Sequence, residues 1–585
     1  MIWKSEKGYT LILTLCILTI FAVISVLLLS VTFSGAQRSE ARGEHTKATE
    51  LAEKGMQHMK NKLHHELVAK LGADGLEYGE YIKQFEALLK MYLCETGESI
   101  KSGDLETGSY EVCILEYENA THAEDDYDPR KKVTLRSIGK TEDQTKEVTY
   151  VIEVGTNTVP DALKYAISTV NPKGTKRNSD GNVYLHGGVE VYGDMNVGNN
   201  LFTHSYGPGL RGQFANWRKT TLPVLYPVNS RLNQSKIELG GKLYQFDPNL
   251  REFTPYRDGE NRTNQSSKAF YDNHLNWQNL NYYKNSTIEQ MFANTTNLPK
   301  VVERKTDPTE VQIAATINEY KNQLRPTTTY NNNRVSDFRK DDTVQFVTGI
   351  FSNSITFTKT NEYRAGVSNQ GKLINFKAGT HRFDQMYVRG NVMIGHETTS
   401  ENNSAYDNIT IEGFTDNKGA QLFVDGNVTI QGANLKSNLT IYTTGNVTIR
   451  YTTIEGKEYL DGREGSLIMF SEGKINIANN SLYLDEPSEL KGFFYSEEAL
   501  EMFGVGSNIK IHGGIAARRI TLNAIRGNYR NETQSWSAAI NPTSLNSPSR
   551  LVIQYDTELI ENFLKLNPPE PIIREIDSSE LIDRR

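Results

Sequence analysis

The sequence predicts a mainly β protein that begins with one long α-helix and ends in a parallel β-helix. An uncharged apolar run covers Tyr9 to Phe33, and a charged segment with one apolar stripe follows it. Alternating apolar and polar residues between 109 and 154 predict an antiparallel sheet that forms a small α+β head. Short strand motifs then recur every 17 to 19 residues in the second half, as in a solenoid of strands.

The apolar run is long enough to cross a membrane. About 20 apolar residues span a bilayer as a helix, whereas a removable signal peptide has an apolar core of roughly 7–15 residues. We therefore expect residues 9–33 to remain as a single-pass transmembrane helix. Basic residues flank both ends of the run, so the charge distribution does not fix its orientation. The membrane-anchoring side chains are expected to include Leu11, Leu13, Ile17, Phe21 and Leu28.

The stretch EKGYTLILTL around Gly8 resembles the processing site of type IV pilin-like precursors, and ATELAEKGM resembles a segment of PilX-type minor pilins. The resemblance covers residues 6–56. It implies that prepilin peptidase removes residues 1–8, and that Tyr9 becomes the methylated N-terminus of the mature chain. It also implies an anchor in the cytoplasmic membrane and assembly with other pilin-like subunits.

Leu13 occupies the position at which most major pilins carry a glutamate. A carboxylate within lipid is costly unless a partner neutralises it. Its absence fits a subunit at a filament tip, or one that never enters a filament. A plain signal-anchor helix is the alternative for this N-terminus.

An amphipathic stalk helix is expected over 34–72 and the small α+β region over 73–156. Apolar residues in the stalk recur at spacings of three and four, which is typical of a helix with one buried face. The histidines of this helix, among them the adjacent His64 and His65, are expected in solvent rather than on a metal. Cys94 and Cys113 can form one disulfide, although two free thiols are equally compatible with the sequence.

Two repeat regions predict the solenoid. Hexads in GNVYLHGGVEVYGDMNVGNNL place its start within 157–204, and the GNVTI-like motifs place its main part within 341–530. In these motifs Val428 and Ile430 should point inward, while Asn427 can form a bend or a ladder of amides. The Asn- and Tyr-rich stretch 205–340 is expected to be an insertion with short helices. Residues 531–585 are expected to form a cap and a C-terminal tail.

Composition narrows the function. The net charge is −7 and basic blocks are absent, so nucleic acid is not an expected partner. The sequence contains no zinc-ligand spacing, P-loop, HExxH or GxSxG motif, and we expect neither a metal, a cofactor nor enzymatic activity. The alternative is a membrane-anchored enzyme that acts on extracellular polysaccharide, with carboxylates and a basic residue on one face. Its candidate residues are Asp425, Asp461, Arg463 and Glu464.

The sequence thus predicts a minor pilin-like surface protein that serves in adhesion, at a filament tip, or in assembly. Its large C-terminal region is expected outside the cell. The expected partners are the cytoplasmic membrane, prepilin peptidase, other pilin-like subunits and surface glycans. A bactofilin-like scaffold polymer in the cytoplasm is a further alternative.

Overall fold

The chain forms two compact units, one of residues 1–158 with 569–585 and the other of residues 159–568. The computed structural model describes residues 9–71, 76–102, 108–120, 130–156, 161–169, 179–211, 214–228, 234–246, 283–294, 297–304, 311, 313–323, 329–330, 350–351, 355–357, 361–363, 366–367, 373–399, 405–413, 419–459, 462, 464–529, 540–559, 572–573, 576 and 579–584. Both units are rich in strands, and the first begins with a long apolar helix. The fold is therefore mainly β, as predicted.

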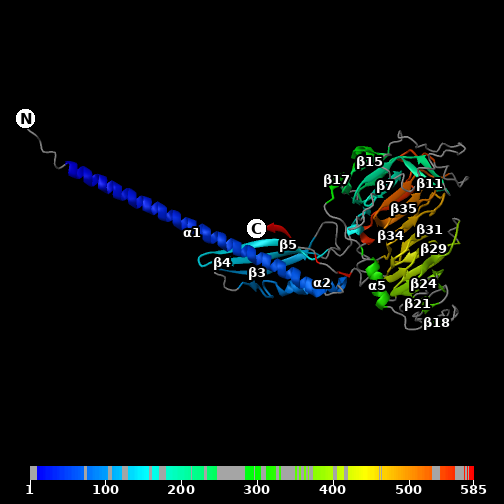
Figure 1. Cartoon of the computed structure of the whole chain (residues 1–585), viewed down its shortest axis with the longest axis horizontal. Helices are drawn as coiled ribbons and strands as arrows, with labels where there is room; N and C mark the ends of the chain where they lie inside the picture. Colours follow the sequence, from blue (N-terminus) through cyan, green and yellow to red (C-terminus); the bar gives the residue numbers. More distant parts are fainter. Residues whose placement is uncertain are drawn as a thin grey trace, which may run out of the picture. The chain divides into compact units, whose positions relative to one another are not determined.

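Helix α1 (Tyr9–Leu71) is a single helix of 63 residues (Figure 1). Its second half buries the predicted apolar stripe, in which Ala52, Met59 and Leu63 have no exposed surface. These residues recur every three or four positions, so they lie along one side of a helix. The helix continues through Gly35 and Gly43, and a Cβ at either position would meet no atom within 4 Å.

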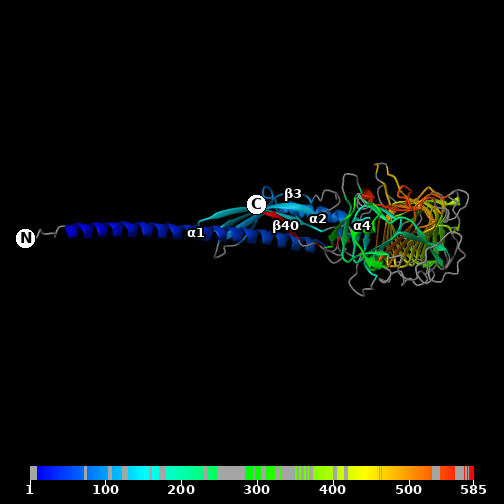
Figure 2. The same ribbon diagram turned by 90° about the horizontal axis from the view of Figure 1, so that it is seen from above.

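The head packs this helix against an antiparallel sheet (Figure 2). Its sheet order is β2-β3-β4-β5-β40, and helix α2 (Tyr78–Met91) completes the core. The predicted alternation is present in β4, where Val133 and Leu135 are fully buried against the helix side. The strands are β2 (Ile100–Lys101), β3 (Ser109–Asn119), β4 (Lys131–Lys140), β5 (Thr145–Val154) and β40 (Glu580–Arg584).

The last described residues return to this head. Strand β40 pairs with β5 as the edge of the sheet, and β39 (Ile572–Ile573) pairs with β1 (Leu76–Glu77). The second unit is therefore an insertion between β5 and β39. This differs from the expected cap and tail over 531–585. Strands of two and five residues carry too little local pattern to indicate a partner so distant in the sequence.

Among the described residues, the largest sheet has 29 strands and belongs to the second unit. The elements of the first part of this unit are η1 (Asp161–Lys164), β6 (Ile167–Thr169), β7 (Val183–Gly187), β8 (Glu190–Tyr192), β9 (Met195–Val197), β10 (Leu201–His204), β11 (Tyr206–Arg211), β12 (Phe214–Lys219), β13 (Val224–Tyr226), β14 (Lys236–Leu239), β15 (Leu243–Phe246), β16 (Tyr283–Asn285), α4 (Ile288–Met291), β17 (Lys300–Glu303), α5 (Ile313–Gln323), β18 (Thr329–Tyr330) and β19 (Ile350–Phe351). Strands β11 and β12, and strands β18 and β19, pair with each other in separate sheets.

Its second part comprises β20 (Ile355–Phe357), β21 (Asn361–Tyr363), β22 (Gly366–Val367), β23 (Leu373–Phe376), β24 (Gly379–Phe383), β25 (Gln385–Arg389), β26 (Asn391–Gly395), β27 (Asp407–Glu412), β28 (Ala420–Asp425), β29 (Val428–Ser437), β30 (Leu439–Thr443), β31 (Val447–Gly456), β32 (Leu467–Ser471), β33 (Ile475–Ile477), β34 (Ser488–Ser496), β35 (Leu500–Gly504), β36 (Ile509–Ala517), β37 (Ile520–Ala524) and β38 (Leu551–Gln554).

The strands from β20 to β38 pair in parallel. Each strand pairs mainly with the second or third strand that follows it in the sequence, as β20 does with β23 and β29 with β31. In β29 and β31, Val428 pairs with Val447 and Ile430 with Ile449. All four side chains are buried, which confirms the inward positions predicted for the repeats. Branched apolar side chains on equivalent positions therefore stack from strand to strand, while Thr429 stays partly exposed on the opposite side.

The order of strands in space differs from their order in the sequence. Strands β6, β7 and β8 pair in parallel with β36, β37 and β38, so the region predicted as the start of the solenoid lies beside the last repeats. Strands β13 and β14 continue this pairing from β8 and β9, although both fall within the predicted insertion 205–340. Inward Val, Ile and Leu residues occur in both repeat regions, and such a pattern does not specify which ends meet.

Asparagines form a row at one edge of these strands, in which each side-chain amide bonds to a backbone N–H and not to the next amide; the sequence had left a bend or a ladder of amides open. Oδ1 of Asn391 accepts from the backbone N–H of Asn427 at 2.9 Å, and Oδ1 of Asn427 accepts from that of Asn446 at 2.8 Å. Oδ1 of Asn446 accepts from the N–H of Lys474 at 2.8 Å, and lysine at this position ends the row. Each amide oxygen thus satisfies a backbone donor of the neighbouring strand connection.

Candidate functional site

The predicted anchor residues all lie on the exposed part of α1. Leu11 is 74% exposed and Leu13 is 47% exposed, and Ile17, Phe21 and Leu28 are also exposed. Such a surface is stable only in an apolar environment. This is the one helix among the described residues that is long and apolar enough to cross a membrane. Gly8 lies outside the described residues, and the helix begins at Tyr9.

The hydroxyl groups of Thr14, Thr19 and Thr32 in this segment bond back to its own backbone. Thr14 donates to the carbonyl of Leu11 at 2.9 Å, and Thr19 donates to that of Cys16 at 2.8 Å. A hydroxyl that is satisfied within the helix adds little cost to burial in lipid. These threonines are therefore compatible with a membrane.

The head contains a disulfide between Cys94 and Cys113, with a Cα–Cα distance of 5.0 Å. It joins the segment after α2 to strand β3, where the N–H of Cys94 also donates to the carbonyl of Ile114 at 2.8 Å. The sequence left this pairing open. Disulfides persist mainly in oxidising compartments.

The described residues around the histidines of α1 form no metal-ligand arrangement. Nδ1 of the exposed His58 lies 2.9 Å from the phenol oxygen of Tyr110. No group of three or more His, Cys, Asp or Glu side chains that could hold a metal ion occurs among the described residues.

Two of the four candidate residues for an enzyme, Asp461 and Arg463, lie outside the described residues. Asp425 ends β28 and accepts from the hydroxyl of Thr444 at 3.4 Å. Glu464 forms an ion pair with Lys491 at 2.5 Å. The two carboxylates thus have different partners.

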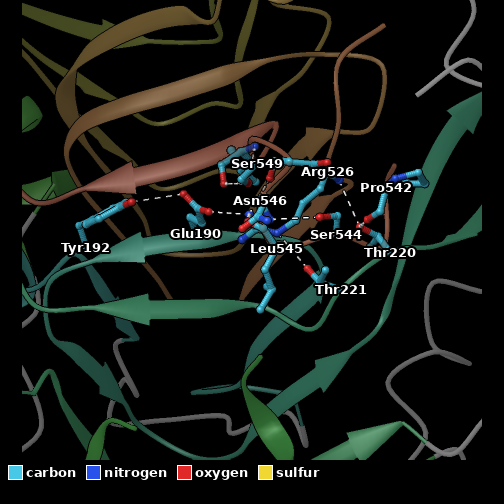
Figure 3. A network of polar contacts seen from close by, with 12 residues as sticks. Glu190, Tyr192, Thr220, Thr221, Arg526, Pro542, Ser544, Leu545, Asn546 and Ser549 are labelled. Atoms are coloured by element: carbon cyan, nitrogen blue, oxygen red, sulfur yellow. Dashed lines mark hydrogen bonds and ion pairs between the residues drawn. The ribbon is translucent and has the colours of Figure 1, made fainter. Parts of the chain in front are cut away.

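A buried arginine joins the two repeat regions (Figure 3). Arg526 is 1% exposed, and its Nη1 lies 2.7 Å from Oε1 of Glu190 on strand β8. Its Nε donates to the hydroxyl of Thr221 at 2.9 Å, and Nη1 also donates to the carbonyls of Leu545 and Ser547. A buried guanidinium requires such a set of acceptors, because its charge is otherwise costly to bury.

Glu190 extends this network to the surface. Its Oε2 accepts from the phenol of Tyr192 at 3.4 Å, while its Oε1 is held by Arg526. The ring of Tyr192 stacks on that of Tyr226 in the next strand, with ring centroids 5.0 Å apart. Burial raises the pKa of Tyr192 to about 12, and burial likewise raises the pKa of Tyr226. Both phenols therefore remain protonated and able to donate at neutral pH.

Two buried histidines lie in register on neighbouring strands. His186 on β7 pairs with His204 on β10, and their ring centroids are 6.0 Å apart. Nδ1 of His186 donates to Oδ1 of Asn523 at 2.8 Å, and Nδ1 of His204 accepts from the N–H of Tyr206 at 2.8 Å. Burial lowers the pKa of His186 to about 4 and that of His204 well below its ordinary value. Both rings are therefore neutral at physiological pH.

Sequence reasoning did not find Arg526, Glu190 or the histidine pair. The signal in the sequence is weak, because Arg526 and Glu190 each lie in segments of alternating or apolar residues and are far apart along the chain. The pairings of β7 with β37 and of β8 with β38 bring these segments together.

No protein-family model matches this chain, and neither a curated protein nor a solved structure matches it. The fold and these sites define a mainly β protein with one N-terminal helix that could serve as a single-pass membrane anchor.

Proposed function

We propose that this chain is a membrane-anchored, minor pilin-like surface protein that acts without enzymatic activity in adhesion, at a filament tip, or in assembly. The observation that carries the proposal is helix α1. Its first half presents exposed apolar side chains, and its second half is the central element of an antiparallel head. The same helix thereby serves as membrane anchor and as core of the folded domain, which is the arrangement implied by the resemblance around Gly8.

The disulfide supports a location of the head outside the cytoplasm. Cys94 and Cys113 are the two cysteines of the chain that lie outside the apolar segment, and they are bonded to each other. Because cytosolic thiols are kept reduced, this pair favours an oxidising compartment. It counts against a cytoplasmic scaffold polymer.

The second unit is proposed to be a β-solenoid that displays a binding surface. Support comes from the parallel pairings between successive repeats and from the asparagine ladder along one edge. Such a stack is rigid, and its outward side chains form long regular rows. A unit of this size, inserted in a pilin-like head, fits a tip or rare subunit better than a repeated filament subunit.

The test is mass spectrometry of the N-terminus of protein purified from membranes. We expect a mature chain that starts at methylated Tyr9, and we expect Gly8→Val to retain Met1. Gly35→Ala is the matched control and should be processed normally, because a Cβ at Gly35 meets no neighbouring atom. An intact Met1 in the wild-type chain, in cells with active prepilin peptidase, contradicts the pilin-like proposal.

Orientation is tested separately by proteolysis of intact spheroplasts. We expect the second unit to be accessible to added protease. Protection of the whole unit until the membrane is lysed would contradict the extracellular location.

A further inference from the structure

One outward face of the second unit carries two rows of side chains in register. Strands β27, β29, β31, β34, β36, β38, β8 and β13 form this face through parallel pairs. Neighbouring strands are about 4.8 Å apart, so each row presents one side chain per strand at that spacing. We call these rows the outward rows. The first consists of Thr410, Lys436, Glu455, Lys491, His512, Gln554, Tyr192 and Tyr226. The second lies two residues earlier on each strand and includes Asn408, Asn434, Thr453, Glu489, Lys510, Val552 and Glu190.

Charges along this face are balanced by partners of opposite sign. Lys436 lies 3.2 Å from Glu455, and Lys491 lies 2.5 Å from Glu464. In the second row, Lys510 lies 3.5 Å from Glu489. Since the cations are already paired, the face offers no excess of positive charge to a polyanion, whose binding requires one.

At one end the first row becomes aromatic. Tyr192 and Tyr226 are stacked and half-buried, and Gln554 beside them is exposed. Glu190 lies two residues before Tyr192 on β8, in the second row, and is held in place by Arg526. This end therefore combines two rigid aromatic side chains with a carboxylate and an amide whose positions are fixed by the strands. Tyrosines of this kind provide contact area at low cost in conformational entropy.

We propose that Glu190, Tyr192, Tyr226 and Gln554 bind one sugar residue of an uncharged, extended polysaccharide that lies along the outward rows. This inference rests on the proposed function and names its ligand class. A sugar hydroxyl both donates and accepts hydrogen bonds, and these four residues offer phenols, an amide and a carboxylate to match it. Further sugar residues would meet the paired polar side chains of the next strands, so affinity would increase with chain length.

The experiment measures binding of soluble saccharides to the full chain in detergent by titration calorimetry. The probes are cellohexaose and dextran as uncharged chains, and polygalacturonate as a polyanion. We expect at least one uncharged chain to bind more tightly than polygalacturonate. Tyr192→Ala and Tyr226→Ala should each weaken that binding about tenfold, which corresponds to about 1.4 kcal/mol.

The matched control is Tyr244→Ala, which removes another half-buried, stacked tyrosine from a different row. It should leave saccharide binding unchanged. The inference is overturned if neither uncharged probe binds, if polygalacturonate binds more tightly, or if the Tyr192 and Tyr226 variants bind as the wild type does. Near-UV circular dichroism of each variant establishes that its fold is retained.

Failure of this inference is distinguishable from failure of the proposed function. Processing at Tyr9 and surface exposure report on the proposed function and do not involve the outward rows. A chain that is processed and exposed but binds no uncharged saccharide would overturn the inference alone.

Discussion

The guanidinium of Arg584 lies 2.6 Å from the carboxylate of Glu53, so that the last strand of the chain is joined to the first helix. Both side chains are partly exposed, and ion pairs of this kind contribute little. The strand itself contributes more, because β40 covers the edge of β5 along Val151 and Ile152. Its place in the head means that the sheet is complete only when the chain has returned from the second unit.

We expect removal of residues 579–585 to destabilise the head by exposing the backbone edge of β5. An open edge also promotes association with other strands. The measurements are thermal unfolding and light scattering of the truncated chain, in which a lower transition temperature and larger particles are expected. Arg584→Ala is the control and should cost less than about 1 kcal/mol. An unchanged transition after truncation would contradict a structural role of β40.

The asparagine ladder gives a second prediction. Asn427→Ala removes the side-chain oxygen that accepts from the N–H of Asn446. The bond from the backbone N–H of Asn427 to Asn391 does not involve the side chain that is removed. We expect a loss of about 1 kcal/mol in the free energy of unfolding, measured with urea. Asn427→Asp keeps an acceptor oxygen and should lose less. Equal losses in the two variants would show that the ladder oxygen is not what stabilises this edge.

Arg526 gives a larger effect, because its removal leaves Glu190 partly buried without its cation. We expect Arg526→Ala to lower the free energy of unfolding by about 3 kcal/mol, as when one member of a buried ion pair is removed. Urea unfolding measures this change. Arg526→Met combined with Glu190→Gln should recover part of the loss, since no unpaired charge remains. If the double variant lost more free energy of unfolding than the two single variants lose together, this explanation would be contradicted.

Local pattern predicted those parts of the fold that depend on residues close in sequence. The stripe around Ala52 and Leu63, the alternation of β4, and the inward Val428 and Ile430 were all evident in the sequence, whereas the ladder at Asn427 was one of two alternatives. The return of β40 to β5 and the pairing of β8 with β38 were not. Both depend on segments that are distant along the chain, and their short strands carry no signal that selects one partner. The Arg526–Glu190 pair was missed for the same reason.

The buried histidines predict that the second unit loses stability in mild acid. In the unfolded chain each histidine binds a proton below about pH 6.5, whereas in the folded chain His186 binds one only near pH 4, and His204 at a value well below 6.5. Between these values the unfolded state holds more protons, so the free energy of unfolding falls as the pH decreases from about 6.5 toward 4. Above pH 6.5 the pair contributes no pH dependence.

The slope of the unfolding free energy against pH tests this prediction. His204→Phe should reduce the slope between pH 6.5 and 4, whatever its effect on stability at pH 7. Asn427→Ala is the control, because it removes no titratable group. It should retain the wild-type slope in the region attributed to the buried pair. Identical slopes in the wild type and His204→Phe would contradict a contribution of His204, and the acid sensitivity would then arise from other groups, among them the buried His381, whose pKa burial lowers to about 4.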